Sequence, residues 1–195
     1  ALAARLPQRV YAQRTYSYVS LCSGLGIELE LASERTESGR HFSALPIRPA
    51  GFCEIDPQLR QFIQSRAPDI PVHGNIYTLL EDLKTGSINF HQKGQVHIVT
   101  AATPYIGPSF ISLLRDTPTL CTHEHALLYA TCQIIFFLRP EVAILEMTDN
   151  SKEDISVAAT DLEHLRILFE QHQYKLSTKV LSSAEINPTP GELIN

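Results

Sequence analysis

The sequence predicts an α/β fold with a mostly parallel sheet and helices on both faces. From Ser17 onward, short apolar runs alternate with helical patterns, which is typical of βαβ units. The runs are rich in Val, Ile, Leu or Phe, as strands buried on both faces tend to be. A length of 195 residues with 44% hydrophobic side chains suits one domain with a sizeable core. We expect residues 1–16 to be a lead-in and residues 17–195 to form that domain.

Five segments are expected to be strands. In chain order they are Tyr18–Cys22, Gly51–Ile55, Val96–Ala101, Val142–Leu145 and Leu176–Leu181.

Three helices are expected between these strands. Apolar residues recur at helical spacing after Asp56-Pro57, where proline suits a first helical turn. A second helix is marked by the apolar positions of 162–169. The third, His125–Leu138, is apolar nearly all round and should be largely buried, with any exposed part a partner surface. Two irregular segments are also expected, an insertion at 39–51 and a proline-rich loop at 103–122.

Composition limits the classes of function. The net charge is −5, from 16 Lys+Arg and 21 Asp+Glu, and no basic run occurs. A domain that binds DNA by itself usually has a basic patch, so DNA binding by this chain alone should be weak or absent. Four scattered cysteines indicate reduced, intracellular thiols, and no apolar stretch suggests a membrane segment.

A glycine turn follows the first strand. Cys22-Ser23-Gly24-Leu25-Gly26 leads from a strand into a helix, where glycines let the backbone approach a ligand closely. The same pattern also serves purely as a tight strand-to-helix corner, and it is not a full dinucleotide fingerprint.

Polar residues follow the next two extended segments. Glu54 stands where a carboxylate accepts hydrogen bonds from ribose hydroxyls, whereas Asp56 is also explained as a helix N-cap. Asn75, in His73-Gly74-Asn75-Ile76, could meet an adenine edge or occupy a turn.

In order and spacing these segments resemble the cofactor half of the DNA cytosine-5 methyltransferases. The likeness covers roughly residues 17–190 and continues through 96–109, 139–148 and 172–190, although every motif is altered. It implies a Rossmann-like, S-adenosylmethionine-dependent methyltransferase fold with that cofactor bound. The implied cofactor residues are Cys22, Ser23, Gly24, Leu25, Gly26, Glu54, Ile55, Asn75, Ile76 and Pro104.

The catalytic half departs from the family pattern. Tyr105 follows Pro104 where the family has its nucleophilic cysteine, and a phenol is a poor substitute for a thiolate. Glu146 keeps the position of the catalytic glutamate, or is simply a carboxylate at a strand end. Glu146-Met147-Thr148 is similar to the pattern of a fungal silencing branch. The two distal arginines and the target-recognition domain have no counterpart.

The resemblance therefore implies an inactive domain with a regulatory or scaffold role in DNA methylation or silencing. Its expected partner is an active DNA methyltransferase or another silencing protein, and its location is nuclear if the chain is eukaryotic. The alternative is an active enzyme that uses a partner chain or Cys121. A C-x-H-x-H run, Cys121 to His125, is better explained as a helix start than as a metal site.

Overall fold

A computed structural model describes residues 15–29, 47–90, 95–103, 123–147 and 155–179. The chain divides into two compact units, Ala1–Glu153 and Asp154–Asn195.

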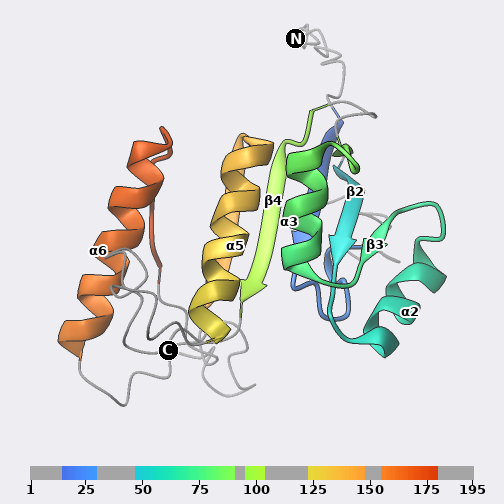
Figure 1. Cartoon of the computed structure of the whole chain (residues 1–195), viewed down its shortest axis with the longest axis horizontal. Coiled ribbons are helices and arrows are strands. Elements are labelled where there is room, and N and C mark those ends of the chain that lie inside the picture. Colours follow the sequence, from blue (N-terminus) through green and yellow to red (C-terminus); the bar gives the residue numbers. More distant parts are fainter. Residues whose placement is uncertain (1–14, 30–46, 91–94, 104–122, 148–154, 180–195) are drawn as a thin grey trace, which may run out of the picture. The chain divides into compact units, whose positions relative to one another are not determined.

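The first unit is built on a five-stranded sheet in which every pairing is parallel (Figure 1). The strands are β1 (Tyr16–Leu21), β2 (Ile47–Cys53), β3 (Val72–His73), β4 (Ile98–Thr103) and β5 (Val142–Met147), in the spatial order β3-β2-β1-β4-β5. This is the order of the first five strands of a doubly wound sheet. In such a sheet the strands after β1 are added first on one side of it and then, from β4 onward, on the other side, so the strand order reverses between β1 and β4. The predicted parallel α/β sheet is thus confirmed.

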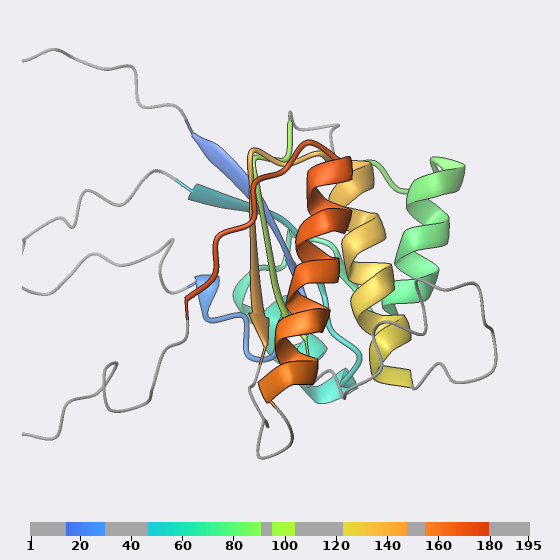
Figure 2. The same cartoon turned by 90° about the vertical axis from the view of Figure 1, so that its left-hand side faces the viewer.

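Three helices belong to this unit: α2 (Pro57–Arg66), α3 (Ile76–Thr85) and α5 (His123–Leu138). Figure 2 shows α3 and α5 together on one side of the sheet, and the two helices contact each other. Helix α2 packs Ile63 against Tyr18 and Phe52 in one buried cluster. Gly51, next to Phe52 and so directed to the opposite face, lies against Phe90, which follows α3. Helices therefore cover both faces.

The helix termini follow the capping rules. Asp56 caps α2 by accepting from the N–H groups of Gln58 and Leu59, directly before Pro57. Asn75 caps α3 in the same way, and Gly86 ends that helix in the left-handed conformation. These side chains satisfy N–H groups that the first turn of a helix leaves without partners.

Most expected elements are present with shifted ends. The helix after Asp56-Pro57 and the buried helix before Leu138 are confirmed, and on the latter Tyr129 and Phe137 are exposed. Strand β2 starts at Ile47, so the insertion predicted for 39–51 was wrong at its end. Its remainder and the loop residues 104–122 lie outside the described residues.

One expected strand was wrong. Residues 176–179 of the predicted strand Leu176–Leu181 form no strand, and residues 180–181 lie outside the described part. The fifth strand is instead β3, which pairs with the end of β2 through only two residues. Helix α3 was not predicted at all.

The second unit contains α6 (Ile155–Gln171). Arg166 lies between Glu163 and Glu170 on the exposed surface of this helix, with N–O distances of 2.5 Å to each. After the helix, Tyr174 packs edge-on against Phe169. In neither unit does a helix of the described residues reach the length and apolarity needed to cross a membrane.

Candidate functional site

The candidate site lies at the carboxyl ends of three adjacent strands, β1, β2 and β3. Leu21 pairs with Cys53, and Cys53 pairs with His73, so the three strands end at one level. Ligands of open parallel sheets bind beyond these ends, close to the point where the strand order reverses. The side chains that follow the strands therefore meet at the place where such a fold usually binds a ligand.

Glu54 is the central side chain of this site. Its Oε2 accepts from the backbone N–H of Gly24 at 2.7 Å, and its Oε1 accepts from that of Asp56 at 2.9 Å. The side chain is buried, with the residue only 7% exposed. Glu54 thus joins the glycine turn after β1 to the start of α2.

The Glu54 carboxylate can accept further hydrogen bonds besides these two. Two carboxylate oxygens offer about four acceptor positions, and the two backbone N–H groups occupy one on each oxygen. The remaining positions suit paired donors such as the two hydroxyls of a ribose.

The glycine turn has a tight internal network. The N–H of Ser23 donates to the carbonyl oxygen of Cys53 at 3.1 Å, and that of Gly26 to the carbonyl oxygen of Ser23 at 2.8 Å. The hydroxyl of Ser23 donates to the carbonyl oxygens of Ser20 and Cys53. The backbone N–H groups of Ser23, Gly24 and Gly26 are therefore all bonded within the protein. The turn would contribute to ligand binding through the course of its backbone and not through free N–H donors.

The two glycines of the turn have different roles. A Cβ on Gly26 would lie 3.2 Å from Ile63 of α2, so this glycine serves close packing. A Cβ on Gly24 would meet no atom within 4 Å. Gly24 thus faces open space beside the Glu54 carboxylate, where a ligand could approach the backbone.

Cys22 holds a strained backbone at the end of β1. Its φ of 53° lies in the left-handed region, which costs a non-glycine residue about 1–2 kcal/mol. Such strain clusters at binding and catalytic sites. Burial raises the pKa of the Cys22 thiol to about 11, with a smaller contribution from the Glu54 carboxylate. Cys22 is therefore a protonated thiol near neutral pH and a weak nucleophile.

Arg60 fixes the segment that carries Glu54. Its Nη1 donates to the carbonyl oxygens of Glu54 and Ile55, at 3.0 and 2.6 Å. The apolar side chain of Ile55 is 68% exposed directly after the buried carboxylate. An exposed apolar side chain beside a hydrogen-bonding carboxylate is a suitable surface for an aromatic ring.

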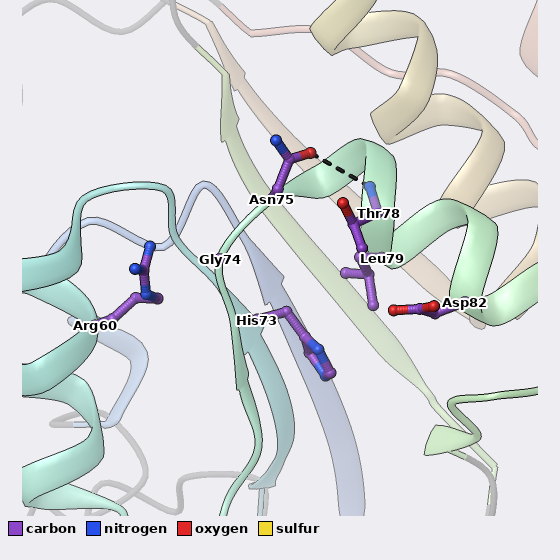
Figure 3. Close-up of a pocket in the computed structure, with 7 residues that line it drawn as sticks. All are labelled: Arg60, His73, Gly74, Asn75, Thr78, Leu79 and Asp82. Carbon is purple, nitrogen blue, oxygen red and sulfur yellow. Dashed lines mark hydrogen bonds between the residues drawn. The ribbon is translucent and has the colours of Figure 1, made fainter.

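A pocket of about 330 Å³ lies beyond β3, between α2 and α3 (Figure 3). Its polar lining includes Arg60, His73, Asn75, Thr78 and Asp82. Burial lowers the pKa of His73, against the opposing charge of Asp82, so its ring is neutral near pH 7. Its Nε2 is buried without a hydrogen-bond partner. Asn75 lines this pocket, whereas Glu54 and the glycine turn do not.

A second carboxylate, Glu28, lies over the neighbouring strands. Its Oε1 accepts from the hydroxyls of Ser20 on β1 and Thr100 on β4, each at 2.9 Å. Glu28 is the first helical residue after the glycine turn. It thus ties the end of that turn to the sheet on the side of β4.

The predicted site residues are only partly brought together. The segment Cys22–Gly26 contacts Glu54, and Asn75 follows the adjacent strand. Ile76 is 5% exposed, so its side chain lies in the core. Glu146 is exposed near the carboxyl end of β5, two strands from β1. Pro104, Tyr105 and Cys121 lie outside the described residues.

Two residues that hold the site together were missed by the sequence reasoning, Arg60 and Glu28. The hydroxyl of Thr103, at the end of β4, is buried without a hydrogen-bond partner. Only Glu28 carried a signal, as a carboxylate in the first turn of a helix that follows a glycine turn. Among the described residues, no three His, Cys, Asp or Glu side chains could hold a metal ion together.

Searches against models of known protein families and against curated protein sequences gave no match for this chain.

Proposed function

We propose that this chain is an S-adenosylmethionine-binding domain of the DNA cytosine-5 methyltransferase type that does not methylate cytosine by itself. Its role is regulatory or structural, in combination with an active methyltransferase or another silencing protein. The observation that carries the proposal is the buried Glu54 carboxylate, held against the glycine turn at the ends of β1 and β2.

The position of Glu54 supports a nucleoside ligand. A carboxylate at the end of the second strand of such a sheet commonly binds ribose hydroxyls. Beside it, Gly24 leaves room for the ligand and Ile55 offers an exposed apolar surface. A bound ribose would therefore have a hydrogen-bonding partner and a neighbouring surface for its base.

A purely structural role for Glu54 is the competing explanation. Two backbone N–H groups already compensate the burial of its charge in part. The strained Cys22 and the open space at Gly24 favour the ligand, because backbone strain clusters at functional sites and the open space leaves room for a ligand beside the carboxylate.

The absence of catalysis rests on the sequence. Tyr105 stands at the position of the family nucleophile, and removal of a covalent nucleophile costs roughly 10⁴–10⁶ in comparable enzymes. Glu146 alone would stabilise a base but would not attack it. We therefore expect no methyl transfer to a cytosine-containing duplex above background, measured with radiolabelled S-adenosylmethionine. Turnover by the purified chain would favour the alternative of an active enzyme.

Calorimetric titration with S-adenosylmethionine and S-adenosyl-L-homocysteine tests the binding function. We expect affinity in the micromolar range, weakened about tenfold or more in Glu54→Ala, because the ribose loses a charged acceptor. Glu81→Ala is the matched control, since that glutamate is exposed on α3 and forms an ion pair with the exposed Lys84.

Folding must be followed in the same samples, because Glu54 also holds the glycine turn. Circular dichroism and thermal unfolding show whether Glu54→Ala remains folded at the titration temperature. If the wild-type chain is folded and binds neither compound, or if Glu54→Ala and Glu81→Ala bind equally, the proposal is wrong.

A further inference from the structure

Arg60 joins three elements at the carboxyl end of the sheet. It belongs to α2, and its Nη1 donates to the carbonyl oxygens of Glu54 and Ile55, the two residues that follow β2, at 3.0 and 2.6 Å. The guanidinium also lies against Gly74, which follows β3 (Figure 3). A Cβ on Gly74 would be 3.1 Å from Nη1 and 3.3 Å from Cζ, so this glycine leaves the room that the guanidinium occupies.

Helix α2 does not depend on these contacts for its own attachment. Asp56 caps its first turn, and Ile63 packs against Phe52 in the core. The two N–H bonds of Arg60 Nη1 are instead directed at consecutive carbonyl groups of the segment after β2. The effect of Arg60 therefore falls on the position of that segment.

This segment carries the central carboxylate of the site. Glu54 Oε2 accepts from the backbone N–H of Gly24 at 2.7 Å, so the position of the carboxylate depends on where the backbone at 54–55 lies. Arg60 holds that backbone on both sides of the peptide bond between Glu54 and Ile55. A binding group that is held in place before the ligand arrives loses less conformational entropy on binding.

From this geometry we infer that Arg60 is a positioning residue, which increases the affinity for a nucleoside by fixing the Glu54 carboxylate. The inference rests on the proposed function, since it concerns the same carboxylate and the same ligand. The competing explanation is a direct contribution, in which the positive charge of Arg60 attracts an anionic part of the ligand.

Calorimetric titration with S-adenosyl-L-homocysteine separates the two explanations when it is applied to the wild type, Arg60→Met, Glu54→Ala and the double variant. Arg60→Met should weaken binding about three- to tenfold, because a looser Glu54 must be ordered when the ligand binds. In the Glu54→Ala background the same change should cost less than about twofold, since the group through which Arg60 acts is already gone. A direct contribution by charge would cost the same factor in both backgrounds.

The backbone amide of Gly24 gives a second readout, which does not need a ligand. Its N–H donates to the Glu54 carboxylate, so its NMR signal reports the position of that carboxylate. In Arg60→Met the amide proton should move upfield and exchange faster with solvent, because the hydrogen bond weakens. Arg60→Lys keeps a charged donor on the same helix and is the milder second variant, expected between the wild type and Arg60→Met in both readouts.

Arg66→Met is the matched control. It removes a cation from the last turn of the same helix, where Arg66 lies over the ring of Phe62, and should change neither the affinity nor the Gly24 signal. Thermal unfolding shows whether each variant is folded at the titration temperature. Equal losses in the presence and absence of Glu54, or an unchanged Gly24 signal in Arg60→Met, would show that this inference is wrong while cofactor binding stands. Failure of the folded wild-type chain to bind removes both proposals.

Discussion

At the scale of the residue, the site depends on carboxylates that join segments far apart in the chain. Glu54 bonds to Gly24 across 30 positions, and Glu28 bonds to Thr100 across 72. Each carboxylate satisfies two donors, so each fixes two segments at once. The glycine turn is held on one side by Glu54 and at its helical end by Glu28.

Replacement of Glu28 should destabilise the fold. Glu28→Ala leaves the hydroxyls of Ser20, which is 1% exposed, and Thr100 without their common acceptor. Leaving buried polar groups unpaired costs about 1–3 kcal/mol in the free energy of unfolding. Urea unfolding followed by circular dichroism measures this cost. Glu81→Ala, an exposed control, should change stability by less than about 0.5 kcal/mol, and equal effects of the two variants would contradict the role of Glu28.

At the scale of the element, the sheet and its helices meet at positions with no spare volume. Gly51 of β2 faces Phe90, and a Cβ there would lie 2.3 Å from Cε1 of that ring. Phe90 is 5% exposed and also packs edge-on against His73. The segment after α3 is thus fitted closely to the middle of β2.

Gly51→Ala should therefore lower stability by about 1–3 kcal/mol or more, because a buried ring cannot move aside without disturbing its neighbours. Differential scanning calorimetry of the single and double variants checks this. Adding Phe90→Leu should recover part of the loss, since the smaller side chain leaves room for the new methyl group. Additive losses in the double variant would show that the close contact is not the cause.

The elements also show where local sequence signals are sufficient. Helices α2 and α5 were predicted from their apolar spacing, and α2 also from the Asp56-Pro57 start. Helix α3 was missed although Asn75, Leu79, Leu83 and Gly86 mark a cap, an apolar stripe and an end. Asn75 was interpreted as a ligand contact or a turn residue, whereas its side chain caps the helix. The strand expected at 176–181 contains three polar residues, Ser177 to Lys179, and residues 176–179 pair with no neighbouring strand.

At the scale of the whole molecule, folding buries the thiols of Cys22, Cys53 and Cys132 and so raises their pKa values. Burial raises the pKa of Cys22 to about 11 and those of Cys53 and Cys132 to about 12. An unfolded thiol has a pKa near 8.5. Because folding raises these values, the stabilisation is fully present below about pH 8 and is lost as the pH rises toward 11 to 12.

The free energy of unfolding should therefore fall with increasing slope above pH 8, and the slope approaches about 1.4 kcal/mol per pH unit for each buried thiol by pH 10. Urea titrations of the reduced chain at several pH values measure the slope. In Cys132→Ala the decrease in the free energy of unfolding per pH unit should be smaller by the contribution of one thiol. A slope that is unchanged in this variant would show that Cys132 ionises as readily in the folded chain as in the unfolded one.

The sequence by itself determined the elements that depend on neighbours within a few residues. These are the strands β1, β2, β4 and β5, helices α2, α5 and α6, the glycine turn, and the N-cap of α2 at Asp56. Apolar periodicity, proline and capping residues act over one or two helical turns, and a single sequence displays them directly. The parallel α/β class follows from their alternation.

Only the tertiary structure decided which segments pair and which side chains meet. Strand β3 completes the sheet through two residues, Glu54 reaches Gly24, and Glu28 reaches Thr100. It also decided that Asn75 turns its oxygen to the helix and its nitrogen outward. These contacts depend on strand order and on the spacing between adjacent strand ends, and periodicity along the chain does not encode either of them.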